Sequence, residues 1–134
     1  MSFGGRAIVV HTLDHARVAL AISAERRVRV TLYTAPGAAS YAGVGYLLAM
    51  INQASSDFPD TLEKAVIDCG SDAGTAQAAL RAGWKTILFR GRGKLAKNLA
   101  GIAKQNGARL IGESEAVVDF GDYEDPMEFG QRWL

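Results

Sequence analysis

The chain has 134 residues and a mass of 14.3 kDa, the size of one domain and too small for a catalytic domain plus a separate substrate domain. Apolar residues make up 49% and charged residues 22%, which excludes a disordered or collagen-like chain. The net charge of +1 hides an asymmetry, because residues 1–110 carry +7 and residues 111–134 carry −6. The basic part could attract phosphates, while the acidic end either stays solvated or docks on that basic surface.

Targeting signals and disulfides are not evident. Cys69 is the single cysteine, so no intramolecular disulfide can form and a reducing, cytoplasmic location is expected. The early apolar run 7–10 is followed by His11, Asp14, His15 and Arg17, which interrupt any signal-peptide core. Residues 30–53 carry no charge, but Pro36-Gly37 divides them into a strand and a helix, so no membrane span is predicted.

Short β-rich runs alternate with helical runs from the start of the chain. Asp14 is predicted to cap the first helix, Gly83 to end the third and Asn106-Gly107 to end the fourth. The fourth helix carries an apolar stripe of Leu95, Leu99, Ile102 and Ala103. Asp125-Pro126 predicts a capped start for a short terminal helix. The predicted strands cover 7–10, 28–33, 64–69, 85–90 and 108–112, and the predicted helices cover 14–25, 41–53, 72–83, 94–105 and the residues after 125.

Five strands joined by four helices predict an α/β fold with a mostly parallel five-stranded sheet. We favour three layers in the flavodoxin-like, doubly wound order 2-1-3-4-5, because 134 residues suffice to cover both faces of the sheet. A half (β/α) barrel in the order 1-2-3-4-5 is the alternative. Residues 1–112 form the predicted α/β domain, and the acidic extension 113–134 either belongs to the same domain or is an arm exchanged between subunits.

Ligands bind at the carboxyl ends of parallel strands in either arrangement, which directs attention to the loops after the third and fourth strands. Gly70 in the first loop and two glycines in the second can present backbone amides, and each loop opens a helix whose positive end faces an anion. Basic side chains add charge to the second loop. The predicted anion site consists of Gly70, Ser71, Asp72, Arg90, Gly91, Arg92, Gly93 and Lys94. Neither loop matches a Walker loop or the dinucleotide fingerprint, so capping and tight turns are the competing interpretation.

Cys69 at the end of the third strand suggests a second, chemical interpretation. In the doubly wound order, His11 and His15 come from the neighbouring strand end, so a Cys-His nucleophile pair could form. A small buried core residue is the competing role for this cysteine. No Cys-x-x-Cys or His-Glu-x-x-His spacing is present, so no metal site is predicted.

One stretch resembles a known family. Residues 79–91, Ala-Leu-Arg-Ala-Gly-Trp-Lys-Thr-Ile-Leu-Phe-Arg-Gly, look like the helix-Ala-Gly-strand-Gly units of phosphate-binding (β/α) barrels such as aldolase-type enzymes. The match covers about a tenth of the chain and transfers no catalytic residue, since no Schiff-base lysine stands at a strand end.

The sequence does not establish a function, and three hypotheses follow from it. The first is a module that binds a small phosphorylated metabolite at the ends of strands three and four, with no cofactor identified. The second is a hydrolase or transferase that uses Cys69 with His11 or His15. The third is a non-catalytic interaction protein. The uncharged 41–51 helix predicts a homodimer, whereas dispersed basic residues without a motif argue against a nucleic-acid partner.

Overall fold

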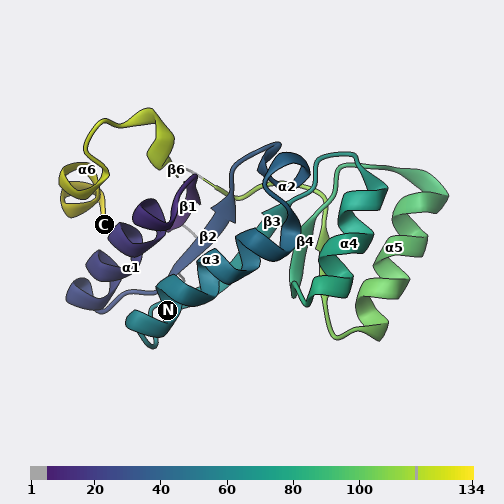
Figure 1. Cartoon of the computed structure of the whole chain (residues 1–134), viewed down its shortest axis with the longest axis horizontal. Coiled ribbons are helices and arrows are strands. Elements are labelled where there is room, and N and C mark those ends of the chain that lie inside the picture. The colour runs from purple at the N-terminus through teal and green to yellow at the C-terminus, as the bar shows by residue number, and fades with distance from the viewer. Residues whose placement is uncertain (1–5, 117) are drawn as a thin grey trace. The chain divides into compact units, whose positions relative to one another are not determined.

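The computed structural model describes residues 6–116 and 118–134 (Figure 1). Helices and strands alternate along most of the chain, as the sequence predicts. The elements are β1 (Ala7–Val10), α1 (Leu13–Arg26), β2 (Val30–Thr34), α2 (Ala38–Tyr41), α3 (Val44–Asp57), β3 (Leu62–Asp68), α4 (Ala73–Ala82), β4 (Thr86–Leu88), α5 (Gly93–Gln105), β5 (Arg109–Ile111), β6 (Val118–Asp119), the 3₁₀ helix η1 (Phe120–Asp122) and α6 (Pro126–Trp133).

The predicted α/β class with a parallel sheet is confirmed, but the sheet has six strands in the order β5-β4-β3-β2-β1-β6. The favoured flavodoxin-like order 2-1-3-4-5 is therefore wrong, and the sequential order of the half barrel is found. Right-handed crossovers between strands in sequential order place their helices on the same face of a sheet, so no strand reversal creates the third layer that we expected. The prediction also missed β6, which returns beside β1.

The chain divides into two compact units, and several elements pass from one to the other. Of the described residues, 6–33, 49–65, 115–116 and 118–134 form the first unit, and 34–48 and 66–114 form the second. The division falls inside β2, α3 and β3, so that each unit contains strands of the sheet and helices that pack on them.

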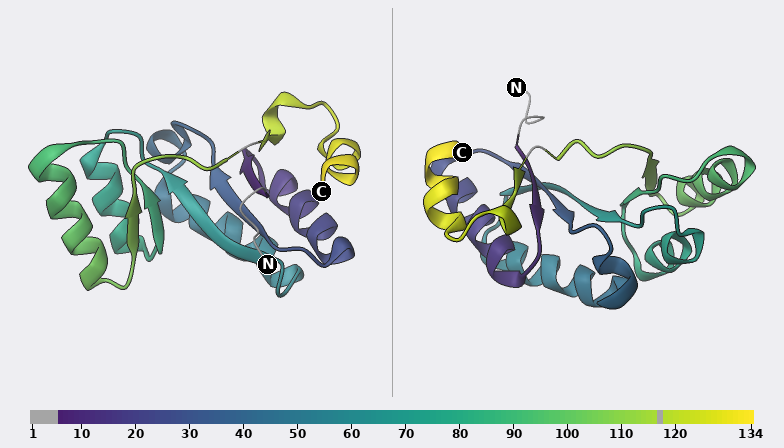
Figure 2. Two further views of the ribbon diagram at one scale, coloured as in Figure 1. Left: turned by 180° about the vertical axis from the view of Figure 1, so that it is seen from behind. Right: turned by 90° about the horizontal axis from the view of Figure 1, so that it is seen from above.

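In the first unit, β1 pairs in parallel with β6, and Val9 lies opposite Asp119. Helix α6 packs along α1, as the views in Figure 2 show. The contact is close at Gly130, where an added Cβ would lie 2.7 Å from Ile22 Cδ1. The backbone N–H of Glu115 donates to the Tyr33 hydroxyl at 3.0 Å, which holds Glu115 beside β2.

In the second unit, β4 lies between β3 and β5, and α4 and α5 lie side by side on these strands (Figure 1). Trp84, which joins α4 to β4, is 2% exposed, and its indole N–H donates to the Val44 carbonyl at 2.9 Å. This bond satisfies the one polar atom of a large buried ring. The apolar stripe predicted for α5 is partly buried, since Leu99 and Ala103 are fully covered.

Local structure explains several details of the helix ends. Thr12, rather than Asp14, caps α1, and its side chain accepts from the N–H of His15. Gly43 does not lie in a helix as predicted, because its φ of +91° separates α2 from α3. No atom comes within 4 Å of a Cβ built at Gly43 or Gly45, so close packing does not explain either glycine. The predicted ends at Gly83 and Asp125-Pro126 are confirmed.

Across residues 6–116 and 118–134, none of the helices has the length and apolar character needed to cross a bilayer.

Candidate functional site

The carboxyl end of β3 carries a buried carboxylate that ties the two glycine loops together. The side chain of Asp68 is 5% exposed, and its Oδ1 accepts from the Gly70 N–H at 2.9 Å and from Arg90 Nη1 at 2.8 Å. The N–H of Arg90 also donates to the Gly70 carbonyl. The two predicted loops are therefore neighbours, but the Arg90 side chain bridges them through its ion pair with Asp68.

Cys69 follows this carboxylate and is buried. Burial raises the pKa of its thiol to about 12, and the charges of Asp68 and Asp72 add to the effect. A thiol with so high a pKa is not a nucleophile near neutral pH. In addition, β2 lies between β1 and β3 in the sheet, so the strand end that carries His11 is not adjacent to that of Cys69. The structure does not bring the cysteine and the histidines together.

The loop after β3 ends in a helix cap. Asp72 is the N-cap of α4, and its Oδ1 accepts from the N–H of Thr75 at 3.1 Å. Hydrogen bonds from Thr75 and Gly74 lower the pKa of the Asp72 carboxyl below its usual range. Gly70 has a φ of +55°, which allows the sharp turn ahead of this helix. Asp72 thus takes the capping role that competes with anion binding in the interpretation of this loop.

The loop after β4 opens α5 differently. Arg92 is the N-cap of this helix, yet no side chain in the described structure caps it. The first amides of α5 are left for solvent or a ligand, and Gly93 turns into the helix with a φ of +69°. Gly91 is needed for space, because an added Cβ would overlap the ring of Phe89, which is 2% exposed. Lys94 stands in the first turn of α5 and is exposed.

Five of the eight predicted site residues line two different cavities of the second unit, and Ser71, Gly93 and Lys94 line neither of them. A cavity of about 550 Å³ lies between the loops after β4 and β5. It is lined by Phe89, Arg90, Gly91, Arg92, Gly112, Glu113 and Ser114. A cavity of about 150 Å³ lies between the loops after β2 and β3, and Gly70 and Asp72 line it together with Asp68, Cys69, Gly37, Ala39, Ser40 and Thr75. Asp68 and Arg90 form the pair between the two cavities.

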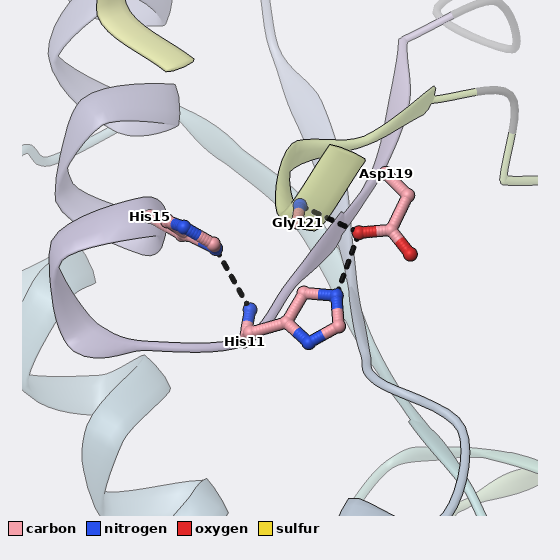
Figure 3. Close-up of polar contacts among 4 residues, drawn as sticks. All are labelled: His11, His15, Asp119 and Gly121. Carbon is pink, nitrogen blue, oxygen red and sulfur yellow. Dashed lines mark hydrogen bonds and ion pairs between the residues drawn. The ribbon is translucent and has the colours of Figure 1, made fainter. Parts of the chain in front are cut away.

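A second polar cluster lies at the carboxyl ends of β1 and β6 in the first unit (Figure 3). His11 Nε2 is 2.6 Å from Asp119 Oδ1, and the N–H of Gly121 donates to the same oxygen at 2.7 Å. The side chains of His11 and Asp119 are 38% and 31% exposed. Because a carboxylate can only accept, His11 Nε2 carries the proton in this bond.

His15 supports His11 from the first turn of α1. Its Nδ1 accepts from the backbone N–H of His11 at 3.1 Å, so the proton of the neutral ring is on Nε2 (Figure 3). The ring also lies edge-on to His11 and to the buried ring of Phe120. Burial lowers the pKa of His15 below its ordinary value, the nearby His11 lowers it further, and Asp14 and Asp119 oppose this.

Sequence reasoning missed Asp119 and Gly121. Asp119 ends a strand of only two residues and Gly121 follows it, in an acidic segment where no alternating pattern marks a strand end. Among the described residues, no group of three or more His, Cys, Asp or Glu side chains is placed to hold a metal ion.

Comparison with known proteins gives the fold only. No family model matches the chain, and no curated protein matches its sequence. A solved structure with a similar fold is that of a putative fructose-1,6-biphosphate aldolase from Coccidioides immitis, with a TM-score of 0.67 and 18% sequence identity. The match covers 81% of this chain and 45% of the other, so the chain spans less than half of that protein's length.

Proposed function

We propose that the chain binds a small sugar phosphate, with the phosphate at the N-terminus of α5 in the cavity between the loops after β4 and β5. The observation that carries the proposal is the uncapped start of α5, with Arg92 at the N-cap and lining this cavity. Unpaired amides at a helix N-terminus, together with the helix dipole, favour an anion.

The charges around the cavity support a phosphate in one position. Arg92 and Lys94 are exposed cations at the start of α5, whereas Arg90 is already paired with Asp68. Glu113 also lines the cavity and disfavours an anion on its own side. The phosphate therefore belongs next to Arg92, and the carboxylate of Glu113 is suited to accept hydrogen bonds from sugar hydroxyls.

The fold supports the class of ligand. The structural neighbour is named for a fructose bearing two phosphates, and in (β/α) barrels the phosphate sites lie in loops at the carboxyl ends of the strands. The cavity between the loops after β4 and β5 lies at the corresponding end of this sheet. The resemblance of residues 79–91 to a barrel unit points to the same ligands.

Calorimetric titration with fructose 1,6-bisphosphate, inorganic phosphate and fructose tests the proposal. Both phosphates should bind and fructose should not, and the variant with Arg92→Ala and Lys94→Ala should lose about tenfold in affinity for each cation removed. The matched control is Lys97→Ala with Lys104→Ala, which removes the same charge from later turns of α5. Equal losses in the two double variants, or no binding of either phosphate, would show that this site is wrong. Binding of phosphate without the sugar bisphosphate would retain the anion site and reject the ligand class.

A further inference from the structure

The His11–Asp119 pair is arranged as an acid–base pair is in enzymes, although nothing in the proposed phosphate site requires it. His11 Nε2 donates to Asp119 Oδ1, with 2.6 Å between the two atoms, and the N–H of Gly121 donates to the same carboxylate oxygen (Figure 3). Within the described part of the chain, His11 Nδ1 has no hydrogen-bond partner. A base oriented by a carboxylate on its other nitrogen is the general arrangement in nucleophile-activating sites.

The sequence at position 121 indicates that space is kept for this pair. Gly121 is not among the glycines with a positive φ, so its backbone does not demand glycine. A Cβ at this position would instead lie 2.5 Å from His11 Nε2, 2.8 Å from its Cδ2 and 3.0 Å from Asp119 Oδ1. Any larger residue would displace the imidazole from the carboxylate.

We propose that His11 and Asp119 form a proton-transfer site in which His11 Nδ1 takes the proton of a neutral hydroxyl group. Asp119 stabilises the imidazolium that forms, as an aspartate does beside a catalytic histidine. The surrounding charges favour a neutral group over an anion, because Asp119 is itself part of the pair, while Asp14 on α1 and Asp122 on η1 lie three residues along the chain from His11 and Asp119 respectively. The hydroxyl belongs to water or to an alcohol, and the experiment below distinguishes these two sources by their products.

The probe for this site is p-nitrophenyl acetate, because its reaction consumes one hydroxyl group and releases a coloured product. His11 Nδ1 removes the hydroxyl proton as the oxygen bonds to the carbonyl carbon. The bond to the p-nitrophenyl oxygen then breaks, and the proton on His11 passes to solvent. Water yields acetate, and added glycerol yields its acetyl ester, so product analysis identifies the hydroxyl source.

Release of p-nitrophenolate is compared among folded variants. His11→Gln and Gly121→Ala should lower the protein-dependent rate about tenfold, and Asp119→Asn should lower it several-fold. These losses are smaller than the usual contribution of a general base in an enzyme. Asp122→Asn is the matched control, since it removes a carboxylate from the neighbouring η1. A rate unchanged in His11→Gln, or an equal loss in Asp119→Asn and Asp122→Asn, would overturn the proposal.

A second measurement uses the unaltered protein, in case the variants do not fold. Diethylpyrocarbonate modifies histidine, and the chain has two histidines whose modification mass spectrometry can follow separately. Loss of the p-nitrophenolate rate should track modification of His11. If it tracks His15 instead, or neither residue, His11 is not the base.

Discussion

Removal of the Asp68 carboxylate is the sharpest test of how the two glycine loops are held. Its Oδ1 accepts one bond from the Gly70 N–H and one from the Arg90 guanidinium, and the side chain is 5% exposed. Asp68→Ala leaves both donors without this acceptor. Asp68→Asn keeps a carbonyl oxygen for the Gly70 N–H but removes the charge that pairs with Arg90.

The expected loss follows from these two bonds. Both bonds go to a charged carboxylate, and such bonds contribute about 1.5–3 kcal/mol each. Arg90 is 45% exposed and regains water when the partner is removed, so the lower figure applies. Asp68→Ala should therefore lower the free energy of unfolding by about 3 kcal/mol, and Asp68→Asn, which keeps the bond from Gly70, by about 1.5 kcal/mol.

Urea unfolding followed by circular dichroism measures these losses, and Arg90→Ala completes a double-mutant cycle with Asp68→Ala. Glu63→Ala is the control, because this carboxylate of β3 is paired with Arg29 at 3.5 Å on the surface and should change stability by less than about 0.5 kcal/mol. If Asp68→Ala costs no more than this control, or if the cycle shows no coupling, the buried pair does not hold the loops.

Three further outcomes are expected. Because burial and His11 lower the pKa of His15 in the folded protein, the unfolded chain binds this proton more readily. The free energy of unfolding should therefore fall in urea titrations as the pH is lowered from about 7.5 through the ordinary histidine pKa of 6.5 and below it, and less in His15→Gln. Gly130→Ala should destabilise by about 1–3 kcal/mol through its contact with Ile22, whereas Gly101→Ala on open α5 should stabilise slightly, as thermal unfolding would show. Cys69, with its pKa of about 12, should resist iodoacetamide at about pH 8 until the chain unfolds; rapid alkylation of the folded protein would contradict its burial.

Local signals predicted most of the elements correctly. The spacing of apolar residues on α5, the positive-φ glycine after α4 and the Asp125-Pro126 start of α6 each act within a few residues of the chain. Interactions at this range are visible in the sequence, because the helix period and the capping bonds are set locally. Element ends differed by a few residues where a neighbour took the cap, as Thr12 did at α1.

The site was predictable only in part. The sequence placed glycines and cations after the third and fourth strands, and the structure joins these loops through Asp68, Gly70 and Arg90. It could not show that Arg90 would be paired with a buried carboxylate, since the two residues are 22 positions apart. As a result, the single anion site predicted from both loops is replaced by two cavities, one on each side of the Asp68–Arg90 pair.

The sequence by itself determined the alternation of strands and helices, the class of the sheet and the separation of a basic body from an acidic end. Tertiary structure decided the strand order, the presence of β6 and the meeting of His11 with Asp119, residues 108 positions apart. A single strand–helix–strand connection is compatible with either strand order, sequential or doubly wound. The choice between them depends on the sum of long-range contacts over the whole sheet, which no short stretch of sequence contains.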